Sequence, residues 1–501
     1  MGRLSLPAGV AGLDVHPAQT AAARNAAADL RLRGALAFCL PLAIYVASAY
    51  HDVMYWDIGE MDTVPYILGI AHPPGFPLYT LIGWAFTHLV PFGSVAFRMS
   101  LLSALAIAGV CWFIFRIAGL AAALLFAFGE DAWTHATRAE AHALVALAFA
   151  AILFFLLRWL HDGRARDLYA SALALGLGIA IHPVVATALP GFLAAIIARA
   201  HLTTPHVLRN AAVIASISAA VWFCYLPLRS AYVNAQDLDP AAAYGVRDGA
   251  FWNYGDPVLA DNWVALVTGR EVGIDDVRYG FTARAYSQGV VHFVQLTVTE
   301  LTPIGLALAI AGIIVLFRRD LTRAIVASAT MLPSALFAFG FSAESDVDRY
   351  FLPAFMLLAV AAGEALAALR RPTLHRIALA ITGLAIVYLL VSQRHFFDQP
   401  HDDRAARDAA EIVRSTPRDA IVVATWVIAP PLAYDDYVLH ETGQRTIIAA
   451  WYGDQIDRLP QWASTQPVYV AGTPQGSVPG YHLERMPTHA ELYRVEKSLT
   501  P

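Results

Sequence analysis

Long apolar segments recur along most of this chain, and they constrain its fold more than any other feature. A helix needs about 20 mostly apolar residues to cross a bilayer, and only helices and closed barrels satisfy their backbone hydrogen bonds there. The chain is 58% hydrophobic and 15% charged, whereas soluble domains contain about 25% charged residues. We therefore predict an all-α polytopic membrane protein with about eleven spans, at residues 34–51, 98–117, 118–131, 139–159, 168–182, 184–199, 208–228, 291–317, 322–341, 349–369 and 374–392.

Three segments fit this pattern less well than the others. Residues 118–131 and 168–182 are short for a span and are predicted to be tilted, half-inserted or wrongly bounded. Residues 76–91 are amphipathic and bounded by prolines, which favours a helix lying at the membrane interface.

Several functional classes are excluded by composition. The single lysine, Lys497, rules out a P-loop or Schiff-base lysine in the body of the chain. A net charge of −5 without a basic, aromatic-rich patch gives no indication of nucleic-acid binding. Cys39, Cys111 and Cys224 each lie inside an apolar run, so neither a disulfide framework nor a zinc site is indicated.

Arginine placement predicts the topology, because positive charges concentrate in cytoplasmic loops. With eleven spans, the arginine clusters around residues 24–33, 158–166, 199–209, 318–323 and 370–376 all fall on one side. We expect a cytoplasmic tail at 1–33, a membrane domain at 34–392 with outer loops 52–97 and 229–290, and a soluble extracytoplasmic domain at 393–501. The N-terminus would then lie in the cytoplasm and the C-terminus outside a bacterial-type inner membrane.

The C-terminal region has the pattern of a small α/β domain. Residues 402–414 are amphipathic with helical periodicity, while Ile421–Ala424 and Pro467–Ala471 are short apolar runs typical of buried strands.

An acidic motif stands just beyond the first span. Asp57 and Glu60 are three residues apart, which places both carboxylates on one face of a helical turn. Either could act as a general base, although solvated loop carboxylates would look the same in sequence. His72 precedes Pro73, Pro74 and Gly75, a combination that ends a helix and turns the chain sharply. His72 could be a ligand or an acid, or could satisfy a local hydrogen bond.

Other polar residues gather at the predicted outer ends of spans, and each has a structural alternative. Arg98 could bind an anionic ligand or snorkel, and Glu140 could serve a site or cap a helix. His182 stands at a helix break. An arginine such as Arg349 suits a headgroup phosphate, or could pair with Asp346 or Asp348. Polar and aromatic groups that would suit a sugar, or simply fold the loop, include Arg229, Asn253 and Asp256.

Taken in order, these segments resemble a known family. Asp57-Ile58-Gly59-Glu60 followed by Leu68 through Tyr79 resembles the hallmark of a membrane glycosyltransferase group once catalogued as a domain of unknown function. That group includes the eukaryotic transmembrane O-mannosyltransferase that acts on plexin-type receptors. The resemblance extends to about residue 360 through Ala139-Glu140, Tyr225–Ser230, Asn253–Pro257 and Arg349–Pro353. The chain departs from the family pattern at Ile58, at Tyr254 and at Ala141-His142, which puts the substrate in doubt.

The resemblance implies a GT-C type fold and transfer, with inversion, of a sugar such as mannose from a polyprenyl-phosphate donor. It implies that Asp57 is the base, with Glu60 supporting the site, and that Arg349 binds the donor phosphate ahead of Arg98 and Arg229. Glu140, His72 and His182 would line the cavity, and no metal or other cofactor is expected. The acceptor could be a Ser or Thr of an exported protein, a glycan or a lipid.

The rival hypothesis is a non-enzymatic polytopic transporter or scaffold. A transporter is expected to carry its ionisable residues at mid-membrane on broken helices. Here they cluster at the predicted outer ends of spans, which favours the enzyme.

Overall fold

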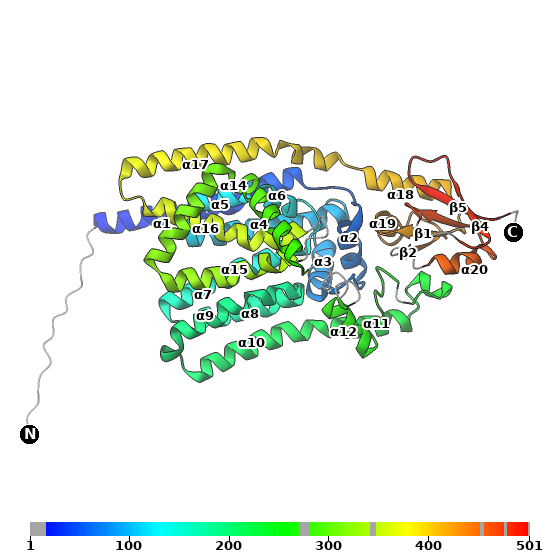
Figure 1. The fold of residues 1–501 in the computed structure, drawn as a ribbon, viewed down its shortest axis with the longest axis horizontal. Helices are drawn as coiled ribbons and strands as arrows, with labels where there is room; N and C mark the ends of the chain where they lie inside the picture. The colour runs from blue at the N-terminus through cyan, green and yellow to red at the C-terminus, as the bar shows by residue number, and fades with distance from the viewer. Residues whose placement is uncertain are drawn as a thin grey trace, which may run out of the picture.

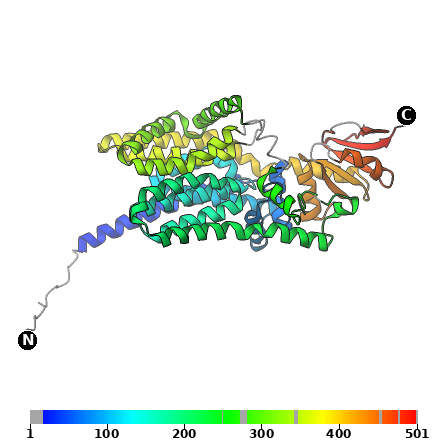
Figure 2. The same ribbon diagram turned by 60° about the horizontal axis from the view of Figure 1, so that its bottom comes forward.

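The protein consists of a helical bundle with a small sheet domain at one end (Figure 1). The computed structural model describes residues 17–247, 249–270, 281–340, 347–450, 455–474 and 478–498. Turning the molecule shows the same two parts, with the sheet domain beyond the ends of the long helices (Figure 2). The predicted all-α membrane fold with a C-terminal α/β domain is confirmed.

Nine helical segments among the described residues are long and apolar enough to cross a membrane. They comprise α1 (Pro17–Ser48), α4 (Val95–Ala118), α7 (Ala141–Asp162), η1 with α9 (Pro183–Ala188 and Leu189–Arg199), α10 with α11 (Pro205–Phe223 and Tyr225–Ala235), α14 (Ala283–Arg319), α15 (Leu321–Gly340), η4 with α16 (Val347–Phe351 and Leu352–Ala368) and α17 (Pro372–Ser392).

The predicted span at 118–131 is instead two short helices, α5 (Leu120–Ala127) and α6 (Glu130–Ala136). Gly129 separates them, and a helix of 8 residues covers only about 12 Å. The segment at 168–182 belongs to α8 (Ala165–Ile181), whose 17 residues run between α7 and α10. The structure therefore supports nine spans by length and leaves the predicted count of eleven unconfirmed.

The remaining helices of the membrane domain are short. They are α2 (Trp56–Ile67), α3 (Pro77–Leu89) and α12 (Ala260–Thr268), together with the single turns η2 (Ala200–Leu202) and η3 (Pro240–Tyr244). Helix α3 coincides with the segment predicted to be interfacial.

Burial is uneven across the bundle, as expected when lipid solvates its outer surface. In α16, 78% of the most apolar window is buried, against 11% for α10 with α11. Exposed apolar side chains mark the peripheral helices, such as Ile217 on α10 and Leu384 on α17. Helix α14 kinks at Thr302, next to Pro303, because proline cannot donate the helical hydrogen bond.

The C-terminal domain contains a five-stranded mixed sheet of order β2-β1-β3-β5-β4. Strand β1 pairs in parallel with β2 and β3, whereas β5 pairs antiparallel with β3 and β4. The elements are α18 (Arg404–Ser415), β1 (Ile421–Thr425), α19 (Ala429–Tyr434), η6 (Asp435–Leu439), β2 (Thr446–Ala450), η7 (Ile456–Arg458), α20 (Leu459–Ala463), β3 (Val468–Ala471), β4 (Tyr481–Arg485) and β5 (Leu492–Lys497). The eight-residue turn η5 (Arg394–His401) joins this domain to α17.

Close contact between α14 and α16 generates a stability prediction. A Cβ atom added at Gly312 would lie 1.7 Å from the carbonyl oxygen of Ala361, whereas one at Gly383 in α17 would meet nothing within 4 Å. We expect Gly312→Ala to destabilise the protein by about 1–3 kcal/mol through overpacking. Gly383→Ala should be neutral or stabilising by up to about 1 kcal/mol. Thermal unfolding of both variants in detergent checks this, and equal melting temperatures would contradict it.

Candidate active site

The site begins at the first turn of α2, where the membrane domain contacts the C-terminal domain. The backbone N–H of Trp56 donates to the carbonyl of Val427 at 3.3 Å. Gly59 permits this approach, since a Cβ atom there would lie 2.2 Å from the carbonyl oxygen of Met54 and 2.9 Å from Pro430. Asp57, in the first turn of the helix, is thereby placed between the bundle and the sheet domain.

The segment after α2 turns back onto it. Leu68 has left-handed backbone dihedrals, Gly75 has φ +83°, and α3 begins at Pro77. The hydroxyl of Tyr225 donates to the carbonyls of Leu68 and Gly69 at 2.6 and 2.9 Å, which holds the turn. His72 is carried back over the face of α2 that bears the two carboxylates.

His72 lies between Glu60 and Asp57. Its backbone N–H donates to Glu60 Oε1 at 2.9 Å, and its Nδ1 contacts Glu60 Oε2 directly. Its Nε2 lies 3.7 Å from Asp57 Oδ2. The Glu60 side chain is fully buried, whereas that of Asp57 is 30% exposed. The spacing argument is therefore correct in placing both carboxylates together, and the structure gives them different environments.

The charge states follow from these environments. Burial lowers the pKa of His72, but the two carboxylates outweigh burial and raise it to about 9. Burial raises the pKa of Asp57, yet the charges of His72 and Arg349 and a hydrogen bond from Trp426 bring it below its usual value. Burial raises the pKa of Glu60 despite His72. At neutral pH, His72 is thus a cation beside an ionised Asp57.

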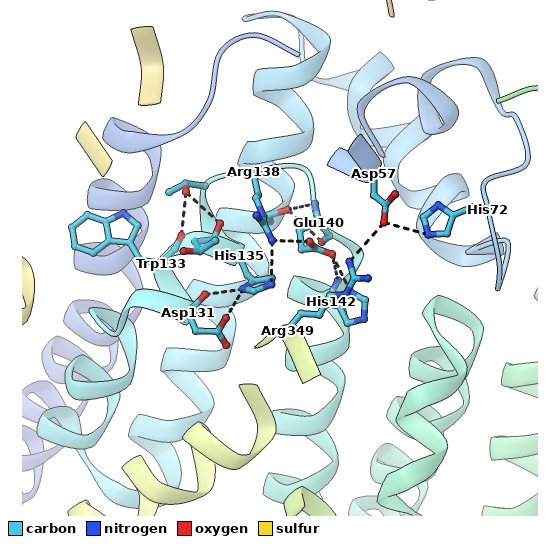
Figure 3. Close-up of polar contacts among 12 residues, drawn as sticks. Asp57, His72, Asp131, Trp133, His135, Arg138, Glu140, His142 and Arg349 are labelled. Carbon is cyan, nitrogen blue, oxygen red and sulfur yellow. Dashed lines mark hydrogen bonds and ion pairs between the residues drawn. The ribbon is translucent and has the colours of Figure 1, made fainter. Parts of the chain in front are cut away.

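Arg349 faces Asp57 from η4, at the start of the most buried helical segment. Its Nη1 lies 4.0 Å from Asp57 Oδ2, and Figure 3 shows the two side chains meeting from separate elements. Asp348 pairs with His292 at 2.6 Å, and Asp346 lies outside the described residues. Arg349 thus has a carboxylate partner in Asp57, which lies on a separate element.

A small cavity of about 10 Å³ separates these groups. Its polar lining consists of Asp57, His72, Glu140, His142 and Arg349. This volume is close to the room that one water molecule requires.

Glu140 closes the far wall of the cavity as the N-cap of α7. Its Oε1 accepts from the backbone N–H of His142 at 3.2 Å and contacts His142 Nδ1 at 2.9 Å. Arg138 lies 3.5 Å from Glu140 Oε2, and a polar chain continues through His135 to Asp131 (Figure 3). The sequence left open whether Glu140 caps a helix or serves a site. In the structure it does both, because it caps α7 and also lines the cavity.

His182 stands behind this wall. Its ring is centred 4.9 Å from that of His142 and 5.5 Å from that of Phe76. Its Nδ1 accepts the backbone N–H of Val184 at 3.0 Å, which caps η1. His182 therefore packs against residues of the cavity wall and also starts the next helical segment.

Two predicted arginines are not brought into the cavity. Arg98 donates to the carbonyls of Thr87, Phe92 and Gly93 at 2.6 to 3.2 Å, where it caps the end of α3. Arg229 donates to the carbonyl of Ile67 at 3.1 Å and lies over the rings of Tyr232 and Trp252. Both guanidinium groups are used by carbonyls at helix ends, where positive charge is favourable. Neither arginine lines the cavity beside Arg349, and a phosphate role for them stays a prediction.

Asn253 and Asp256 also lie outside the cavity. Asp256 Oδ1 accepts hydrogen bonds from Ser230, Asn234 and Asn253 at 2.8 to 3.1 Å. Asn253 is fully buried. Asn253 and Asp256 therefore connect the second outer loop to α11. These hydrogen bonds fit the alternative from the sequence, in which the two residues fold the loop instead of binding a sugar.

Trp426 was not foreseen from the sequence. Its Nε1–H donates to Asp57 Oδ1 at 2.7 Å, across 369 residues of chain. No short motif marks it, because it follows β1 in a region whose sequence indicates only a small α/β domain.

One group of side chains has metal-ligand geometry among the described residues. Asp57, Glu60 and His72 each offer a ligand atom, and these atoms lie within 4.8 Å of one another. In the structure His72 Nδ1 contacts Glu60 directly. A proton shared between these two side chains is the alternative to a metal ion bound by them.

Comparison with known proteins agrees with this architecture. The N-terminal domain of protein O-mannosyl-transferase TMEM260 matches residues 57–118 and 112–205. The mouse protein O-mannosyl-transferase TMEM260 is 26% identical over 429 residues, covering 78% of this chain and 59% of the mouse protein. The Dictyostelium discoideum homologue is 33% identical over 127 residues, covering 23% of this chain and 15% of its own. The chain thus spans about three-fifths or less of the length of these relatives.

Among solved structures, ArnT from Cupriavidus metallidurans shares the fold. Its complex with undecaprenyl phosphate gives a TM-score of 0.54 at 12% identity, covering 92% of this chain and 97% of ArnT. The apo state gives 0.56 at 13% identity with the same coverage. The predicted resemblance is confirmed in two respects: the chain is a multi-pass membrane protein that shares the fold of ArnT, and its residues 57–205 are similar to the N-terminal domain of protein O-mannosyl-transferase TMEM260.

Proposed function

We propose that the protein is a membrane glycosyltransferase that moves a sugar from a polyprenyl-phosphate donor to a hydroxyl acceptor. The observation that carries the proposal is the pairing of Asp57 with Arg349 across one cavity. A carboxylate held ionised can accept a proton, and a guanidinium group matches a phosphate bidentately. Together the two groups could serve the two ends of a displacement at a sugar carbon, the attacking hydroxyl and the leaving phosphate.

The proposed step is a single inverting displacement. Asp57 takes the proton of the acceptor hydroxyl while the hydroxyl oxygen attacks C1 of the donor sugar. The bond between C1 and the phosphate oxygen breaks, and its electron pair leaves with the polyprenyl phosphate. Arg349 stabilises the developing charge on that phosphate. His72 helps to keep Asp57 ionised before the reaction, and Glu60 holds His72 in place.

The relatives support the choice of substrates. The mouse and Dictyostelium proteins are named protein O-mannosyl-transferases, and ArnT was captured with undecaprenyl phosphate. Mannose as the sugar, and a Ser or Thr hydroxyl as the acceptor, are the first substrates to test. We place the site on the outer face of a bacterial-type inner membrane, with the N-terminus cytoplasmic and the C-terminal domain outside.

Removing the base tests the reaction. Asp57→Asn should lower transfer from labelled polyprenyl-phosphate mannose by about 10²- to 10⁴-fold, the usual contribution of a general base. Asp62→Asn on the same helix is the matched control. Asp62 does not line the cavity, and burial raises its pKa well above the usual value, so activity should persist. Wild-type transfer by Asp57→Asn would exclude Asp57 as the base.

The phosphate role of Arg349 predicts a different kinetic effect. Arg349→Ala should raise the donor KM by about 10- to 100-fold, because a charge-assisted hydrogen bond contributes about 1.5–3 kcal/mol. Arg394→Ala is the control, since Arg394 is exposed on η5. Titration of purified protein with the labelled donor measures both. An unchanged donor affinity in Arg349→Ala would assign the phosphate to another cation.

We propose that transfer needs no metal ion. His72, with a pKa of about 9, is protonated at neutral pH and already supplies a positive charge between the two carboxylates. A protonated imidazole has no lone pair for a metal. Dialysis against a chelator should leave the transfer rate unchanged, and added Mn²⁺ or Mg²⁺ should not raise it. A loss on chelation that metal restores would instead make Asp57, Glu60 and His72 a metal site.

A further inference from the structure

We propose that the C-terminal domain completes the active site by supplying Trp426 as a positioning residue, whose indole holds the Asp57 carboxylate in its reactive orientation. This inference rests on the proposed function, because it assigns the base a partner from outside the membrane domain. It also assigns the C-terminal domain a role in the reaction that is independent of the identity of the acceptor.

The contact has the geometry of a strong hydrogen bond. Trp426 Nε1 lies 2.7 Å from Asp57 Oδ1, and the donor is aimed at one oxygen only. The other oxygen, Oδ2, faces His72 at 3.7 Å and Arg349 at 4.0 Å. The indole therefore differentiates two otherwise equivalent oxygens and leaves Oδ2 toward the cavity.

Such a restraint matters because the terminal torsion of an aspartate is soft. Rotation about this sp³–sp² bond is broad, with no deep staggered minima. Its first-turn position in α2 fixes the Cα atom of Asp57 but not the plane of its carboxylate. A base has to lie within hydrogen-bond reach of the proton that it removes, so orientation directly affects the rate.

The indole itself is held rigidly. Trp426 is 5% exposed and stacks on Phe251 with ring centroids 5.9 Å apart and planes 11° apart. Tyr254 meets the indole edge at 6.5 Å, and the ring of His72 lies at 6.3 Å. Two rings from the second outer loop therefore pack against the indole.

The whole domain is docked onto the segment that bears Asp57. The hydroxyl of Tyr55 donates to Asp408 on α18 at 2.6 Å, and the hydroxyl of Tyr434 on α19 accepts from the backbone N–H of Ala96 at 3.2 Å. Together with the Trp56 to Val427 backbone bond, these contacts come from both sides of Trp426 in sequence. A strand end fixed in this way positions a side chain more accurately than a free loop does.

A pair of tryptophan variants separates this role from simple domain stability. Trp426→Phe keeps an aromatic ring and removes the N–H donor. Trp462→Phe is the matched control, because Trp462 is also buried in the C-terminal domain and its Nε1–H donates to the second outer loop, at the carbonyl of Tyr244, at 3.2 Å. Both variants lose one indole hydrogen bond between this domain and a membrane-domain loop, but only one loses it at Asp57.

We expect Trp426→Phe to lower kcat by about tenfold or more, while the donor KM stays within about twofold. The acid limb of its pH profile should move to higher pH, because the lost hydrogen bond no longer helps to lower the pKa of Asp57. Trp462→Phe should keep the wild-type kcat and acid limb. Steady-state kinetics across pH, with melting temperatures of both variants, provide the measurement.

Three outcomes decide the inference. A selective fall in kcat with a shifted acid limb in Trp426→Phe supports it. If Asp57→Asn is inactive but Trp426→Phe behaves like Trp462→Phe, the positioning role is wrong while the proposed function stands. If Asp57→Asn retains transfer in the same assay, Asp57 is not the base and both proposals fall.

Discussion

The burial of Glu60 is the constraint on which the rest of the site depends. A carboxylate without solvent exposure needs a counter-charge and hydrogen bonds, since an unpaired buried charge costs several kcal/mol. His72 supplies both from one residue, through its backbone N–H and its ring. This pairing requires the chain to fold back within twelve residues, as it does at Leu68, where the backbone is left-handed.

The same pairing organises the groups around it. With His72 held against Glu60, its second ring nitrogen faces Asp57, and Asp57 in turn faces Arg349. Negative and positive groups therefore alternate along the line Glu60, His72, Asp57, Arg349. Alternation of this kind favours the ionised forms and brings together three separate segments, α2, the turn that follows it and η4, which the membrane span count alone would not place side by side.

Features of the fold and the site that depend on neighbouring residues can be predicted from the sequence, whereas those that depend on contacts between distant residues cannot. Apolar length identifies most spans, but Gly129 divides 118–131 into two helices that hydrophobicity alone cannot separate. Helical spacing places Asp57 and Glu60 together correctly. Arg98 and Arg349 both stand at helix ends in sequence, and only tertiary contacts distinguish them. Arg98 bonds carbonyls within eleven residues of itself, whereas Arg349 meets Asp57 from a distant helix.

Trp426 shows where reasoning from sequence stops, and why. Its contact with Asp57 spans 369 residues and depends on the docking of a whole domain, so no local pattern could indicate it. Strands β1 and β3 are predictable because their apolar runs are local. The physical consequence is that the site is assembled from both ends of the chain. A membrane domain folded alone would carry the base, its histidine and its arginine, yet would leave one oxygen of Asp57 without the donor that orients it.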